Sequence, residues 1–97
     1  MNRPVTIRPK AKSDLRRAHD WYEERCPGLG DEFLADHAEA LLRLEADPER
    51  FPLYYRGFRR VLTHRFPYKI FFRIVERNLI VVRILHGAQD HPRVLRP

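Results

Sequence analysis

Cations recur in a segment that otherwise has the pattern of a half-buried strand. Residues 59–75, RRVLTHRFPYKIFFRIV, alternate apolar and polar side chains with a period of two. Many of the polar positions hold Arg or Lys, where Thr, Ser or Glu would serve a solvated face equally well. Arg can bind a carboxylate or phosphate group through two parallel hydrogen bonds. The segment therefore predicts that a negatively charged partner lies on this face of a sheet.

Charge is divided unevenly between the two halves of the 97-residue chain. Residues 1–49 contain eight Lys and Arg against eleven Asp and Glu, whereas residues 50–97 contain eleven against two. Sixteen of the nineteen cationic residues are Arg. A merely solvated basic surface does not need this segregation, so the asymmetry favours a basic half that binds an acidic partner.

The composition is that of one globular domain, residues 1–97. Hydrophobic residues make up 43% of the chain and eleven residues are aromatic, which is enough for a single core. No apolar run approaches the ~20 residues that span a bilayer, and the N-terminus lacks the apolar stretch of a secretion signal, so no membrane partner is expected. The single cysteine, Cys26, cannot form an internal disulfide, which favours a reducing, cytoplasmic setting. His37 has no other metal ligand spaced with it, and we expect a core histidine, no metal, no cofactor and no small-molecule substrate.

Apolar periodicity predicts an α+β fold in which two helices pack on a C-terminal antiparallel meander. Apolar residues at helical spacing predict helices over 11–25 and 31–46, and the short break CPGLG between them predicts an antiparallel hairpin. A short strand is expected at residues 5–8. Residues 48–58 are expected to form a loop that their aromatic side chains pin to the fold. The strands of the meander are predicted at 59–63, 68–75 and 79–86.

Side-chain parity predicts a register for the last hairpin. With a three-residue turn at 76–78, Phe72 faces Val82 and Phe71 faces Arg83. A two-residue turn would instead place Arg83 in the core opposite Phe72, which is costly. The face predicted to pack on both helices consists of Ile70, Phe72, Ile74, Ile80, Val82 and Ile84. The opposite face, expected to stay open, carries Lys69, Phe71, Arg73, Val81, Arg83 and Leu85.

Three stretches together resemble the RelE/ParE superfamily of bacterial type II toxin–antitoxin toxins. They are DLRRAHDWYEERCPGLGDEF, RRVLTHRFPYKIFFRI and IVVRILHGAQDHP, and the likeness extends over nearly the whole chain. It depends on the order and spacing of Trp21 and Tyr22 before PGLG, of FPY after the paired arginines, and of the tail from His86 to Pro92. The superfamily fold is a strand, a helical hairpin and a three-stranded antiparallel sheet, in agreement with the pattern above.

The resemblance implies one of two activities. RelE-like members cut messenger RNA on the ribosome, whereas ParE-like members poison DNA gyrase. Cleavage would need proton transfer and cations around the scissile phosphate, and the residues that would supply them are His86, Arg60 and Arg65. However, the sheet has one lysine, and no tyrosine follows His86 as it does in many RelE-like nucleases. We therefore expect a ParE-like gyrase poison rather than an enzyme, with the ribosome-dependent nuclease as the alternative.

The same resemblance implies an antitoxin that holds the toxin silent in a hetero-oligomeric complex. We expect an acidic, apolar-rich segment of that antitoxin to lie on the open sheet face, where exposed apolar residues stand beside cations. The predicted antitoxin contacts are Phe71, Arg73, Val81, Arg83 and Leu85. The predicted contacts to the target, gyrase or alternatively ribosome and mRNA, are Arg60, Arg65, Lys69, Arg83 and His86.

Overall fold

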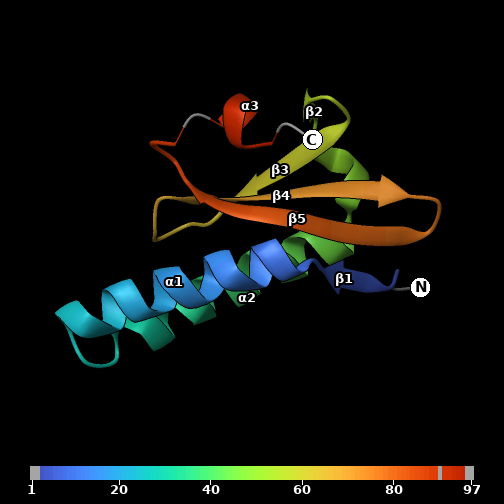
Figure 1. The fold of residues 1–97 in the computed structure, drawn as a ribbon. Coiled ribbons are helices and arrows are strands. Elements are labelled where there is room, and N and C mark those ends of the chain that lie inside the picture. The colour runs from blue at the N-terminus through green and yellow to red at the C-terminus, as the bar shows by residue number, and fades with distance from the viewer. Residues whose placement is uncertain (1–2, 90, 96–97) are drawn as a thin grey trace.

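The computed structural model describes residues 3–89 and 91–95, and of residues 91 and 92 the backbone alone. Two long helices lie on one side of a β-sheet and a short helix lies on the other (Figure 1). In chain order the elements are β1 (Val5–Ile7), α1 (Pro9–Arg25), α2 (Leu29–Ala46), the 3-10 helix η1 (Pro48–Arg50), β2 (Leu53–Tyr55), β3 (Phe58–Leu62), β4 (Tyr68–Val75), β5 (Asn78–His86) and α3 (His91–Val94). The predicted α+β fold is confirmed.

The sheet has five strands in the order β1-β5-β4-β3-β2. Strands β3, β4 and β5 form the predicted antiparallel meander, and β1 adds to it parallel to β5. Strand β2 lies in the segment that was predicted to be a loop, and it pairs with β3 in an irregular register. Because β1 pairs with the last strand, the N-terminal segment is tied to the C-terminal half of the chain.

The helical hairpin is held at its tip by the side chain of Glu23. Its carboxylate accepts hydrogen bonds from the backbone N–H groups of Gly28 (2.8 Å) and Gly30 (3.0 Å), which lie at the start of α2 and have no partner within the helix. Gly28 has φ = 89°, a left-handed conformation that favours glycine. A Cβ atom at Gly30 would lie 2.7 Å from the His19 ring, so the two helices approach closely here. The CPGLG segment therefore reverses the chain as predicted.

The core between the helices and the sheet takes apolar side chains from both layers. Its buried members are Ala11, Ala40, Leu44, Val61, Ile70, Phe72, Leu79, Val81 and Ile84. Toward the hairpin tip the core becomes aromatic, and the ring centroid of Phe33 lies 5.6 Å from that of Phe66 and 5.0 Å from that of Tyr68. His37 of α2 is buried, as predicted for a core histidine. Ile74 packs against this core with partial exposure.

A β-bulge between β4 and β5 divides the predicted register in two. The predicted pairs are confirmed as far as Phe71 opposite Arg83. Beyond that point the register shifts by one, so that Phe72 faces Val81 and the hairpin turn consists of residues 76–77. The predicted three-residue turn is therefore wrong. The bulge permits a two-residue turn and still keeps Arg83 away from the core, a combination that an unbroken ladder excludes.

The bulge also exchanges the faces on which residues 79–82 lie. Leu79 and Val81 are fully buried on the helix side, whereas Ile80 and Val82 lie on the opposite side with partial exposure. The predicted burial of Ile80 and Val82 under the helices is thus wrong, and so is the predicted exposure of Val81.

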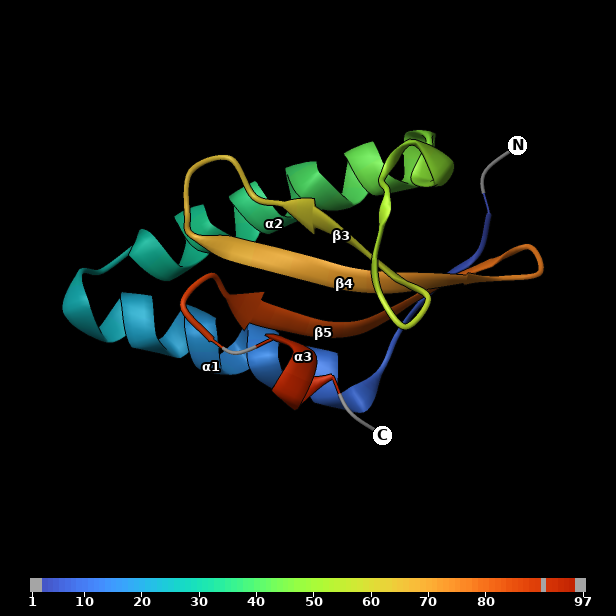
Figure 2. The same ribbon diagram turned by 90° about the horizontal axis from the view of Figure 1, so that it is seen from above.

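The sheet face opposite the two long helices is covered in part by the C-terminal segment. Helix α3 lies over this face (Figures 1 and 2). Leu95 is buried together with Phe58, Phe71 and Leu85, and the four side chains form a second core. The predicted exposure of Phe71 and Leu85 is wrong, since their exposed fractions are 0% and 1%. The reason is that the chain folds its own tail over them.

Candidate functional site

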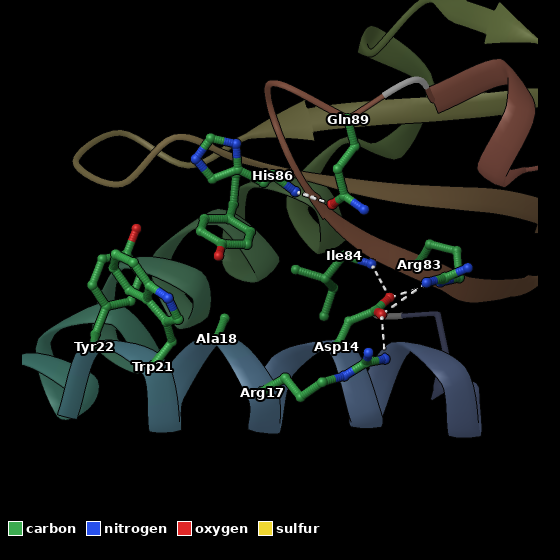
Figure 3. A pocket seen from close by; sticks show the side chains of 10 residues that line it. Asp14, Arg17, Ala18, Trp21, Tyr22, Arg83, Ile84, His86 and Gln89 are labelled. Carbon is green, nitrogen blue, oxygen red and sulfur yellow. Dashed lines mark hydrogen bonds and ion pairs between the residues drawn. The ribbon is translucent and has the colours of Figure 1, made fainter. Parts of the chain in front are cut away.

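A pocket lies where α1 passes the end of β5 (Figure 3). Its volume is about 350 Å³, and its walls come from α1, β4, β5 and the segment after β5. We call it the Trp21 pocket. It is lined by Asp14, Arg17, Ala18, Trp21, Tyr22, Tyr68, Arg83, Ile84, His86 and Gln89. Because charged and aromatic side chains converge on one hollow, it is a candidate binding site.

A buried carboxylate closes one end of the Trp21 pocket. Asp14 is 8% exposed and binds the Arg83 guanidinium with both oxygens, at 2.7 Å from Nε and 2.9 Å from Nη2. Its Oδ2 also accepts a hydrogen bond from the N–H group of Ile84 at 3.0 Å. Strand β1 pairs with β5 only as far as Val81, so Asp14 satisfies an amide that the strand does not reach. The hydrogen bond to Asp14 raises the pKa of Arg83 more than burial lowers it, so the guanidinium stays charged.

The other end of the pocket is formed by His86. Its backbone N–H donates to the side-chain oxygen of Gln89 (2.8 Å), and its Nδ1 accepts from the N–H of Ala88 (3.0 Å). Nδ1 is therefore the hydrogen-bond acceptor of the ring in this arrangement. The ring stands edge-on to Tyr68 with 5.3 Å between centroids. The segment after β5 thus fixes the orientation of this imidazole.

Aromatic rings from α1 form the outer wall. Trp21 is 51% exposed, and the guanidinium of Arg25 lies 3.3 Å from the centroid of its ring. Trp21 also stands edge-on to Tyr22, 5.1 Å away. Burial raises the pKa of the Tyr22 and Tyr68 hydroxyls, and the neighbouring Tyr22 raises that of Tyr68 further, so both phenols are neutral at physiological pH. An exposed tryptophan held between a cation and a second ring is a preformed contact point.

Arg17 supplies the pocket's exposed charge. Its Nη2 lies 3.6 Å from Asp14 Oδ1, yet its side chain is 75% exposed. Among the described residues, two arginines and one carboxylate line the pocket, which leaves one excess positive charge. Because Arg83 is bound to Asp14 with both donors, Arg17 is the cation better placed to meet a partner.

The structure brings together two of the five predicted target contacts, Arg83 and His86. Arg60 lies over the ring of Tyr54, 4.1 Å from its centroid, at the β2–β3 side of the sheet. Arg65 forms an ion pair with Glu32 of α2. Lys69 of β4 is registered between Leu62 and Leu85 and does not line the Trp21 pocket. The cations predicted to act together are therefore distributed over separate parts of the surface.

Sequence reasoning missed Asp14, Arg17 and Trp21 as members of a site. Asp14 was detectable, because it occupies the same helical stripe as Ala11 and Ala18, where a carboxylate needs a buried partner. Arg17 is an exposed position on α1, and nothing in its spacing distinguishes it from other solvated residues. Trp21 contributed to the family resemblance, but its position alone did not indicate a site.

A second pocket lies on the sheet face opposite the long helices, beside α3. Its volume is about 330 Å³ and we call it the basic groove. Its apolar lining residues are Phe58, Val75, Ile80, Val82, Val94 and Leu95, and its cationic ones are Arg8, Lys10, Arg73 and Arg83. Arg73 packs over Phe58, 4.1 Å from the ring centroid, and donates to the carbonyl of Arg56 (3.0 Å). Of the predicted antitoxin contacts, Arg73 and Arg83 line this groove, whereas Phe71, Val81 and Leu85 are buried and line neither pocket.

A cluster of potential metal ligands, His19, Glu23 and Asp31, lies at the hairpin tip with its donor atoms within 4.8 Å of one another. These atoms already have partners. Glu23 binds two backbone N–H groups, and the His19 ring lies between Asp20 (3.0 Å) and Asp31 (3.3 Å). The hydrogen bond to Asp20 is the main cause of a raised His19 pKa. The arrangement is an ion-paired clamp between α1 and α2.

Comparison with known proteins identifies the family. The model of the ParE toxin of the type II toxin–antitoxin system parDE matches residues 5–91. The chain belongs to the ParE toxin family. Its resemblance to the RelE/ParE superfamily is thereby confirmed, and it is a toxin component of type II toxin–antitoxin systems. No curated protein sequence matches it significantly.

Two solved structures share the fold of this ParE-family chain. The chromosomal ParDE toxin–antitoxin system of P. aeruginosa contains a chain with 22% identity and a TM-score of 0.77, and the match covers 87% of this chain and 95% of that one. The RelBE2 toxin–antitoxin complex of Mycobacterium tuberculosis contains one with 22% identity and a TM-score of 0.63, covering 89% and 99%. Both similar structures are of toxin–antitoxin systems. In the described part of the chain, no helix combines the length and apolar character needed to cross a membrane.

Proposed function

We propose that this ParE-family toxin inhibits growth by poisoning DNA gyrase in the cytoplasm, and that the Trp21 pocket contacts gyrase. One observation carries the proposal: a half-exposed, preoriented Trp21 stands beside the exposed Arg17, while the remaining cation, Arg83, is bound to Asp14. Trp, Tyr and Arg are the residue types that dominate the energetics of protein–protein contacts. Of the predicted target contacts, Arg83 and His86 remain part of this surface.

The arrangement supports a protein target better than an RNA phosphate. A scissile phosphate in the Trp21 pocket would meet the Asp14 carboxylate, and Arg60 and Arg65 lie elsewhere with aromatic or acidic partners. The Nδ1 atom of His86 already accepts a hydrogen bond from a backbone N–H group, so this nitrogen is not poised for proton transfer. These features favour the gyrase proposal over the ribosome-dependent nuclease.

The proposal is tested with purified chain in gyrase supercoiling and DNA-cleavage assays. We expect the wild type to inhibit supercoiling and Trp21→Ala to raise the inhibitory concentration by at least about tenfold, as loss of an interface anchor does. Leu42→Ala is the matched control, because Leu42 is 67% exposed on α2, away from the pocket. Message cleavage on ribosomes that His86→Gln abolishes, with gyrase unaffected, would establish the nuclease instead.

A further inference from the structure

We propose that the first half of α1 binds the phosphate backbone of duplex DNA, so that the toxin contacts the DNA on which gyrase acts as well as gyrase itself. The inference rests on the proposed function, which assigns a surface to gyrase but none to its DNA. It concerns five exposed cations within ten residues, which we call the α1 patch: Arg8, Lys10, Lys12, Arg16 and Arg17.

The α1 patch lies in the half of the chain whose net charge is negative. Residues 8–17, RPKAKSDLRR, contain five cations and one carboxylate, whereas residues 20–25, DWYEER, contain three carboxylates and one cation. The single carboxylate of the first stretch, Asp14, is buried and points toward β5, where it binds Arg83 with both oxygens (Figure 3). The exposed surface of residues 8–17 therefore carries cations and no carboxylate.

The charge of the α1 patch is not neutralised by the rest of the described chain. The four cations other than Arg17 form no ion pair with any residue that the structure describes. Arg17 lies 3.6 Å from Asp14 and its side chain is 75% exposed. By contrast, the exposed Arg65 is paired with Glu32 of α2. The cations of the patch are thus available to an external anion.

The position of these cations is unfavourable for the helix itself. The positive end of the helix macrodipole lies at the start of α1, where carboxylates stabilise a helix and cations do the opposite. The first turn of α1 nevertheless contains no acidic residue, and Arg8 at the N-cap position makes no capping hydrogen bond with its side chain. Helix stability therefore does not explain the arrangement. Residues that break a local rule in this way are expected at functional sites.

The exposed surface of the α1 patch suits a nucleic-acid backbone better than a protein partner. Its apolar side chains face inward, since Ala11 is buried and Leu15 packs against the main core. The residues exposed between the cations are Pro9 and Ser13. A protein contact needs apolar or aromatic anchors at its centre, whereas protein–DNA interfaces are more polar and much more positively charged.

The extent of the α1 patch also fits a duplex. Ten helical residues extend about 15 Å, a length of duplex that carries about nine phosphate charges on its two strands. Each cation can therefore meet a phosphate, and binding through phosphates does not depend on base sequence. Arg17, at one end of the patch, also lines the Trp21 pocket. A protein bound at the pocket could thus hold its DNA against the patch.

The test measures binding of the purified chain to a fluorescently labelled duplex of about 20 base pairs, at salt concentrations between about 50 and 200 mM. The double variant Lys12→Gln/Arg16→Gln should bind at least about tenfold more weakly. Its slope of log affinity against log salt should be smaller by about two, because each phosphate contact contributes about one. With gyrase present, it should need about tenfold more protein to trap cleaved DNA, while its affinity for DNA-free gyrase stays that of the wild type.

A matched control removes two exposed cations outside α1. Arg50→Gln/Arg77→Gln changes one arginine of η1 and one of the turn between β4 and β5. Both double variants lower the net charge by two, so they differ in the location of the change. The control should bind DNA within about twofold of the wild type, because phosphate contacts act at short range in salt.

A charge reversal supplies a readout that a structural role would not produce. Lys12→Glu should weaken DNA binding and yet raise the thermal midpoint by about 2–4 °C, since a carboxylate four residues before Arg16 and close to the start of the helix stabilises α1. A lower midpoint together with weaker binding would assign Lys12 to folding and would count against the inference.

The outcomes separate this inference from the proposed function. Equal losses of DNA binding in the two double variants would show that net charge alone governs it, and would overturn the inference while gyrase poisoning stands. Loss of affinity for DNA-free gyrase in Lys12→Gln/Arg16→Gln would make the α1 patch a protein contact and would also overturn it. If the wild type binds DNA through the patch but does not inhibit gyrase, the DNA contact stands and the target proposal falls.

Discussion

The two faces of the sheet are buried by different means. On the helix side, side chains such as Phe72 and Ile84 are covered by two long helices whose apolar stripes match the strand pattern. On the other side, Phe71 and Leu85 are equally buried, but their cover includes the short tail segment around Leu95. One face is thus closed by extensive, regular packing, whereas the other is closed by few residues and leaves a groove beside them. Two side chains can therefore have the same exposed fraction although one is covered by two long helices and the other by a short segment.

The largest effect on stability is expected when the two adjacent phenylalanines of β4 are replaced by alanine. Phe72→Ala should lower the free energy of unfolding by about 3–5 kcal/mol, because the helices cannot collapse into the space left behind. Phe71→Ala should cost less, about 2–3 kcal/mol, because α3 can settle into its space. Urea unfolding of both variants measures the difference. A loss at Phe71 equal to that at Phe72 would show that the tail is as firmly packed as the helices.

A smaller effect is expected from loosening the tail itself. Leu95→Ala should destabilise the protein by about 2 kcal/mol, since Leu95 is 6% exposed and contributes to the second core. Amide hydrogen exchange near Phe71 and Leu85 should accelerate, while the helix-side core keeps its protection. Val75→Ala, on the same face but partly exposed, is the control and should change stability by no more than about 0.5 kcal/mol. Faster exchange throughout the protein would mean that the two faces unfold as one unit.

The helix side of the fold could be predicted because local patterns and global packing agree there. The hairpin, the meander and the burial of Ile70, Phe72 and Ile84 follow from periodicities that only one arrangement satisfies. Phe71 opposite Arg83 also follows, because the alternative would bury a cation.

The other face could not be predicted in the same way. Residues 79–82, LIVV, are apolar without interruption, so parity cannot reveal which pair faces the helices once a bulge is allowed. Helix α3 has four residues, too few to leave a periodic signal. The Trp21 pocket could not be predicted either. Asp14 and Arg83 are 69 residues apart in the chain, and their pairing depends on where β1 ends.

The smallest expected effect is on the pH dependence of stability, and it comes from two histidines of the helical layer whose pKa values shift in opposite directions. Burial lowers the pKa of His37 below its ordinary value of 6.5, and its Nε2 has no hydrogen-bond partner among the described residues. The unfolded chain therefore takes up a proton below pH 6.5 more readily than the folded one does, and stability falls as the pH falls. His37→Leu should remove this loss, so that the thermal midpoint changes less between pH 7.5 and pH 5.

His19 provides the contrasting control, because the hydrogen bond to Asp20 is the main cause of its raised pKa. Its stabilising contribution is fully present below pH 6.5 and is lost as the pH rises through the folded-state value. His19→Gln should therefore lower the thermal midpoint at pH 5 relative to pH 7.5, the reverse of the His37 variant. The difference follows from position: the His37 imidazole is inside the layer, where desolvation outweighs the charge of Asp36, and the His19 imidazole bridges two carboxylates at its solvated tip. Melting curves of both variants that shift in the same direction with pH would show that net charge, and not these two environments, governs the acid response.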